Sequence, residues 1–171
     1  MVAPSTTHRL ALVGIGAVIV LSVAMWVYVF FVADSSAQDS LSSKAFPTAA
    51  EPICAKTVQQ LKDSGLPLKK ADTPAERADL VDQADTIVKG MVDQLQAIAP
   101  TTGPDAPVIK AWLGDWQVWF SDRAKWAASL RAGQSGPFNE TQRSTGEPNS
   151  AALSTLADNN NMHDCGIPYA V

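Results

Sequence analysis

The sequence is poor in the side chains that bind metal ions or act as catalytic nucleophiles. Its 171 residues include two cysteines and two histidines. His8 precedes a long apolar stretch, so His163 has no second imidazole with which to build a zinc or haem site in the rest of the chain. Phosphate-binding loops, nucleophile elbows and EF-hand loops are also lacking. We therefore expect no metal site, no cofactor and no enzymatic activity.

Basic side chains are also too few for a nucleic-acid-binding surface. The chain has 13 lysines and arginines against 17 aspartates and glutamates. Arg9 lies before the apolar stretch, so the residues after it carry 12 basic and 17 acidic side chains, a net charge of about −5. A surface of that sign repels nucleic acid and anionic lipid headgroups. We expect no nucleic-acid partner.

A long apolar run sets the expected location of the chain. The stretch from Leu10 to Val32 has 23 residues and no charge. As a helix it measures about 34 Å, enough to cross a hydrocarbon core of about 30 Å. His8 and Arg9 precede it and Asp34 follows it, so the positive-inside rule places the N-terminus in the cytoplasm. We predict a single-pass protein of the plasma membrane whose C-terminal domain lies outside.

The predicted span divides the chain into a cytoplasmic N-terminus (1–9), a transmembrane helix (10–32), a flexible tether (33–48) and an extracytoplasmic domain (49–171). The alternative is a signal peptide cleaved after Ala37, although the apolar core exceeds the usual length of about 7 to 15 residues. Small residues on one side of the span either contact a second helix or are incidental. That stripe consists of Gly14, Ala17, Leu21, Ala24 and Tyr28. The expected partners are the lipid bilayer and another membrane or envelope protein.

Helical periodicity dominates the extracytoplasmic part, and no stretch predicts a strand. A first helix is expected over 52–62, with its proline in the first turn. Residues 73–76 (Thr-Pro-Ala-Glu) form a capping box that starts an amphipathic helix of about 25 residues. A short linker and a third helix over 107–132 then predict an antiparallel hairpin. With a last short helix over 150–158, the expected fold is all-α, a three- to four-helix bundle.

The two cysteines, Cys54 and Cys165, both fall on the expected outer side of the membrane, where disulfides persist. We expect them to pair with each other and to close the bundle with one disulfide. The tripeptide His163-Asp164-Cys165 also suggests part of a metal site or a thiol nucleophile, but a disulfide would consume the thiol. A surface tail held by Cys165 is therefore the favoured interpretation.

Four of the five tryptophans lie on one face of the third helix: Trp112, Trp116, Trp119 and Trp126. Such a stripe at helical spacing favours a core, and a ligand groove or partner platform is the alternative. Arg123 falls in the middle of this face, where an unpaired guanidinium would be very unfavourable. We expect it to pair with a carboxylate, to stack on a ring, or to lie at a pocket mouth. Asp115 and Asp122 are the carboxylates near it on the same helix.

Short patterns in the third helix and the tail carry a resemblance to a known group of proteins. The patterns are Trp112-x-x-Asp115-Trp116, Asp122-Arg123 and Asn161-Met162-x-x-Cys165-x-x-Pro168. With one early and one terminal cysteine bracketing a helical region, the stretch from Cys54 to Pro168 resembles membrane-anchored helical envelope proteins of high-GC Gram-positive (actinobacterial) bacteria. That group has no assigned activity, so the resemblance implies none.

These features together predict an extracytoplasmic, membrane-anchored helical protein that acts by binding, as an accessory or scaffold component of a membrane or envelope complex. The alternative is a binder or carrier of a small apolar or anionic envelope ligand in a tryptophan-lined groove. The two hypotheses differ in whether the tryptophan face is filled by other side chains.

The predicted topology can be tested on intact cells. An accessibility tag at Lys69, or within residues 134–148, should react with a reagent that does not cross membranes. A tag at the N-terminus should be protected, because the charge bias places that end inside. The reverse labelling pattern would overturn the topology and remove the reason to expect a disulfide.

Overall fold

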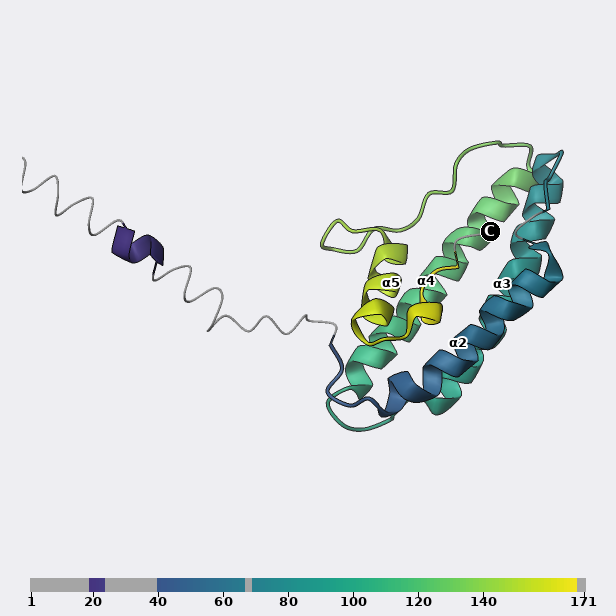
Figure 1. The fold of residues 1–171 in the computed structure, drawn as a ribbon. Coiled ribbons are helices and arrows are strands. Elements are labelled where there is room, and N and C mark those ends of the chain that lie inside the picture. The colour runs from purple at the N-terminus through teal and green to yellow at the C-terminus, as the bar shows by residue number, and fades with distance from the viewer. Residues whose placement is uncertain (1–18, 24–39, 67–68, 169–171) are drawn as a thin grey trace, which may run out of the picture. The chain divides into compact units, whose positions relative to one another are not determined.

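A computed structural model of the protein describes residues 19–23, 40–66 and 69–168. The chain divides into two compact units, 1–37 and 38–171, and the second is the helical domain (Figure 1). Its elements are α2 (Ala45–Ser64), α3 (Pro74–Ile98), α4 (Ala106–Arg131), α5 (Asn149–Asn159) and the 3-10 helix η2 (His163–Cys165). The described residues contain no strand, only an isolated bridge between Gln142 and Pro148. The all-α fold class is confirmed.

The predicted transmembrane segment lies mostly outside the described residues. Of its positions, residues 19–23 are described, and they are helical. No helix in the described parts of the chain is both long and apolar enough to span a bilayer. Of the five residues in the stripe of small side chains, only Leu21 is described. Membrane anchoring and the helix contact therefore stay predictions.

The first helix of the domain begins earlier than the sequence suggested. α2 starts at Ala45 rather than Pro52, so residues 45–48 of the predicted tether belong to the helix and Pro52 lies inside it. Phe46 is buried, and its ring stands edge-on to Trp112 with 6.3 Å between the ring centroids. Because this contact joins residues far apart in the sequence, helical periodicity did not predict it.

α3 and α4 form the long hairpin that the sequence predicted (Figure 1). The capping box is confirmed, since Thr73 Oγ1 accepts the Glu76 N–H and the Glu76 carboxylate accepts the Thr73 N–H, each at 3.2 Å. α3 has 25 residues, as its periodicity predicted. α4 and α5 begin and end within one residue of the expected positions. Gly133 has a φ of 80°, the left-handed conformation that glycine tolerates after a helix.

One main hydrophobic core forms where the helices meet. Residues at most 3% exposed in it include Cys54, Leu61, Val88, Val92, Leu95, Ile109, Trp112, Trp116, Leu153 and Met162. α2 lies against α3, α5 lies against α4, and α3 and α4 contact each other along their length (Figure 1). A smaller cluster joins the start of α3 to the end of α4 through Ala78, Val81, Ala127 and Leu130. The α3–α4 hairpin is therefore the frame on which the other elements lie.

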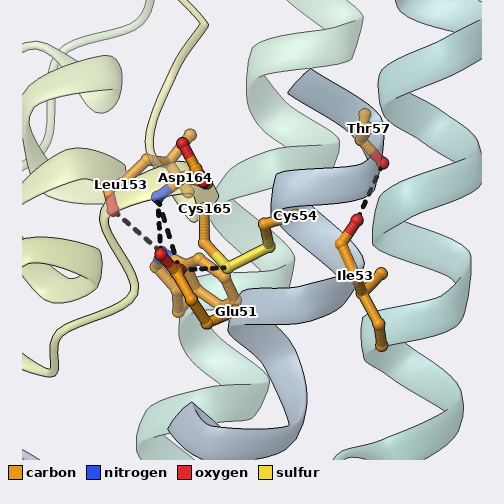
Figure 2. Close-up of a disulfide and its surroundings, with 8 residues drawn as sticks. Glu51, Ile53, Cys54, Thr57, Leu153, Asp164 and Cys165 are labelled. Atoms are coloured by element: carbon orange, nitrogen blue, oxygen red, sulfur yellow. Dashed lines mark hydrogen bonds between the residues drawn. A yellow bond between two sulfur atoms is a disulfide. The ribbon is translucent and has the colours of Figure 1, made fainter. Parts of the chain in front are cut away.

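Cys54 of α2 and Cys165 of η2 form the predicted disulfide, with 2.02 Å between the sulfur atoms (Figure 2). Both residues are fully buried. Glu51, on the same helix, accepts the Asp164 N–H at 3.3 Å and lies 3.9 Å from Cys165 Sγ. That second approach is a van der Waals contact, because a disulfide sulfur has no proton to donate. The C-terminal tail is thus fixed to α2.

The disulfide should contribute strongly to the stability of the domain. It closes a loop with a sequence separation of 111 residues. In the chain-entropy model a loop of this length stabilises a protein by about 4 to 5 kcal/mol. Cys54→Ser and Cys165→Ser should each lower the melting temperature by the same amount as the double variant, because each removes the same cross-link. Detection of two free thiols in the purified protein would contradict this expectation.

Candidate functional site

Three of the four tryptophans of α4 belong to the core. Trp112, Trp116 and Trp119 are at most 4% exposed. Consecutive rings meet edge to face, with centroids 6.3 Å apart for Trp112 and Trp116 and 5.6 Å apart for Trp116 and Trp119. The Trp112 indole N–H donates to the Leu153 carbonyl of α5 at 3.0 Å. These rings are packed against each other and against α5, and among the pockets described below only the one of about 320 Å³ is bordered by one of them, Trp112.

Trp126 departs from this pattern because a loop covers it. Its ring is half-buried, lies 5.5 Å from the Phe138 ring, and has the Arg77 guanidinium 5.4 Å from its centre. Its indole N–H donates to the Gly136 carbonyl at 3.0 Å. Trp126 therefore holds the loop between α4 and α5. It borders a pocket of about 280 Å³ that is separate from the one of about 320 Å³ beside Trp112.

Arg123 joins α4 to α3 inside the domain. It is 2% exposed, and its Nε donates to Asp85 Oδ1 at 2.5 Å. Its guanidinium also lies 4.6 Å from the centre of the Trp119 ring. Pairing with a carboxylate and stacking on a ring are thus both confirmed. Same-helix reasoning did not identify Asp85, because the register between two helices decides which carboxylate reaches the guanidinium.

The environment of Asp85 makes its charge dependent on Arg123. Burial raises the pKa of Asp85 above its ordinary value, and the charge and hydrogen bond of Arg123 offset only part of that rise. Because the pKa of Asp85 is higher in the folded protein than in the unfolded chain, this carboxyl favours folding most at acid pH. Its contribution to stability is lost as the pH rises through the folded-state pKa. We therefore interpret the pair as a device that fixes helix register rather than as a net source of stability.

Two aspartates of α4 hold the loop that follows it. Asp122 Oδ2 accepts the Thr141 N–H at 2.6 Å, and Asp122 Oδ1 accepts a hydrogen bond from Lys125 Nζ at 3.2 Å. Partial burial would raise the pKa of Asp122, but these hydrogen bonds outweigh it and leave that pKa below its ordinary value. Asp115 forms an ion pair with Arg143 at 3.3 Å. Both carboxylates thus have structural roles in positioning the loop.

The chain enters the domain beside the loop that joins α3 to α4. The Asp105 carboxylate accepts the Ser42 N–H at 2.8 Å and the Ser43 N–H at 2.9 Å. The Leu41 N–H donates to Asn160 Oδ1, also at 2.8 Å. We call these three hydrogen bonds the entry clamp. The hydrogen bond from Ser42, helped by Ser43, holds the pKa of Asp105 below its ordinary value, so acid weakens this contact only when the pH falls to that lower pKa.

Two pockets open on either side of the same loop. The larger has a volume of about 740 Å³ and lies over the end of α3, the loop and the first three turns of α4. The smaller has a volume of about 390 Å³ and is bordered by Phe46, Ile98 and Ile109 beside the entry clamp. Both volumes fall in the range of about 300 to 1,000 Å³ that is usual for ligand pockets. We call them the larger and the smaller loop pocket, and neither is lined by a tryptophan.

Pockets are the candidate binding surfaces that the described residues offer. Within the described ranges, no group of three or more His, Cys, Asp and Glu residues could hold a metal ion. No known protein family, curated protein or solved structure matches the chain. The resemblance to actinobacterial envelope proteins therefore stays a prediction, and the loop pockets become the candidate site on geometry alone.

Arg123 allows a direct test of the buried pair. Arg123→Ala should destabilise the domain by about 3 to 5 kcal/mol, because it removes the buried guanidinium and leaves the half-buried Asp85 carboxylate without this partner. Arg123→Lys should recover only part of the loss, since the planar guanidinium is missing. The loss should shrink in acid, where Asp85 is protonated. Thermal melts at neutral and acid pH measure both effects.

A paired substitution serves as the control for this test. Replacing both partners with apolar residues, Asp85→Leu with Arg123→Met, should restore most of the stability because no buried charge remains. A loss of less than about 1 kcal/mol for Arg123→Ala, the scale of ordinary surface substitutions, would show that the pair has no structural role.

Proposed function

We propose that the chain is a membrane-anchored, extracytoplasmic helical protein that acts by binding, as an accessory or scaffold component of a membrane or envelope complex. The observation that carries the proposal is the entry clamp. From Leu41 onward the chain is hydrogen-bonded to Asp105 and Asn160. Only residues 33–40 therefore separate the predicted span from the first clamped residue, half the tether that the sequence suggested.

The disulfide supports the expected location. Cys54 and Cys165 are both fully buried and joined, and such bonds persist in oxidising compartments outside the cytoplasm. The N-terminal charge bias predicts the same side of the membrane for the domain. The resemblance to actinobacterial envelope proteins, which rests on the third helix and the tail, agrees with this proposal.

A binding role also agrees with how the polar side chains are used. Arg123, Asp115 and Asp122 all form structural contacts inside the domain or with its loop. Trp112, Trp116 and Trp119 belong to the core, which favours the binding role over a carrier with a continuous tryptophan-lined groove, although Trp112 and Trp126 each border a small pocket. The loop pockets keep a ligand-binding role open at a different place.

The proposal predicts a specific partner that requires the folded domain. We expect chemical cross-linking of the full chain in intact membranes, followed by solubilisation in mild detergent and mass spectrometry, to recover the same envelope or membrane protein reproducibly. The control is the full chain with Cys54→Ser and Cys165→Ser, which keeps residues 1–44 but loses the cross-link that holds the domain together. This control should lose the partner.

Two outcomes would contradict the proposed role. Recovery of the same partner at undiminished yield with the double cysteine variant would assign the interaction to the predicted span rather than to the domain. Recovery of the full chain in the soluble fraction, with no cross-linked partner, would overturn both the anchoring and the accessory role.

A further inference from the structure

The larger loop pocket has the shape of a trough along α4. Pro107, Lys110, Gly114 and Gln117 line it at spacings of three or four residues. These positions cover ten residues of rise, so the trough follows the helix for about 15 Å. An elongated site of this kind suits an extended, flexible molecule better than a compact one.

The lining of the trough is apolar at its base and mostly uncharged at its edges. Leu113, which is 6% exposed, lies in the wall together with Pro100 and Pro107. Gln96 and Gln117 contribute neutral amides, and Lys110 is the one ionisable side chain among the lining residues. Such a surface favours burial of hydrocarbon with a polar group at one end.

A missing side chain keeps the trough open. A Cβ atom added to Gly114 would meet no atom within 4 Å, so the space above this position is empty. Gly90 of α3 is equally open, but it does not line the pocket. A large side chain at Gly114 would therefore project into the trough. The same side chain at Gly90 would lie outside the trough.

The entry clamp limits the length of chain that lies between this loop and the predicted anchor. Asp105 ends the loop that borders the trough, and it binds Ser42 and Ser43. Eight residue steps lead from Val32, the end of the predicted span, to Ser40, and a fully extended chain covers about 28 Å in that number of steps. On the other side of the loop, the smaller pocket includes Ile98, which is 40% exposed. The chain between the predicted span and Ser40 is thus at most about 28 Å long.

We propose that the larger loop pocket binds one acyl chain of a membrane lipid. The proposal rests on the membrane anchoring proposed above. An acyl chain is the occupant that a bilayer offers in abundance to an apolar trough at this distance.

Photo-cross-linking of the full chain in phosphatidylcholine nanodiscs tests the proposal. The probe is a phosphatidylcholine with a diazirine on one acyl chain, and mass spectrometry locates the modified residues. We expect modification both within 10–32, which reports the anchor, and within 96–117, which reports the pocket. Gly114→Trp should reduce the second signal by about tenfold, because the indole displaces the contacts of about two methylene groups of the chain. Gly90→Trp, the matched control, should leave it unchanged.

The two regions of modification separate the failure of this proposal from the failure of the anchoring. Modification within 10–32 but not within 96–117 would overturn lipid binding in the pocket and leave the anchor standing. An equal loss in the Gly114→Trp and Gly90→Trp variants, or no loss in either, would also overturn it. Absence of modification within 10–32 would remove the anchoring itself and the lipid proposal with it.

Discussion

The burial of a guanidinium between two helices constrains how this domain is assembled. Arg123 must meet a carboxylate, and Asp85 on α3 meets it. Sliding α4 along α3 by one helical turn, about 5.4 Å, would separate the two groups and leave the Arg123 charge buried without its Asp85 partner. The tryptophans of α4 that flank Arg123 therefore pack beside α3 in only one alignment of the two helices. The charged pair selects the alignment, and the apolar contacts around it supply the burial that stabilises the fold.

Features that depend on neighbouring residues were predictable from the sequence. The capping box that starts α3 lies within residues 73–76, and the length of α3 follows from the spacing of its own apolar side chains. The start of α2 was not predictable in this way. It depends on the burial of Phe46 against Trp112, which lies 66 positions later in the chain. Local periodicity contains no information about such a contact.

The candidate site was less predictable than the fold for the same reason. Asp105 occupies the position that caps α4, yet its carboxylate makes no capping hydrogen bond and binds the backbone of Ser42 and Ser43 instead. The smaller loop pocket exists only where residues 42–49 meet the α3–α4 loop, and the larger one depends on how the loop within 96–117 folds between the two helices. The tryptophan stripe correctly indicated a core, but Trp126 lies outside that core because the following loop packs on it.

The entry clamp also determines how force would pass into the domain. A pull on the chain at Ser40 acts on the hydrogen bonds of Leu41, Ser42 and Ser43 before it reaches α2. Asp105 belongs to the α3–α4 loop, and Asn160 follows α5, so the load is shared between two elements that are far apart in the sequence. Helix α2 is further fastened through the disulfide to η2. Tension at the entry point is therefore distributed over the whole bundle instead of unwinding its first helix turn by turn.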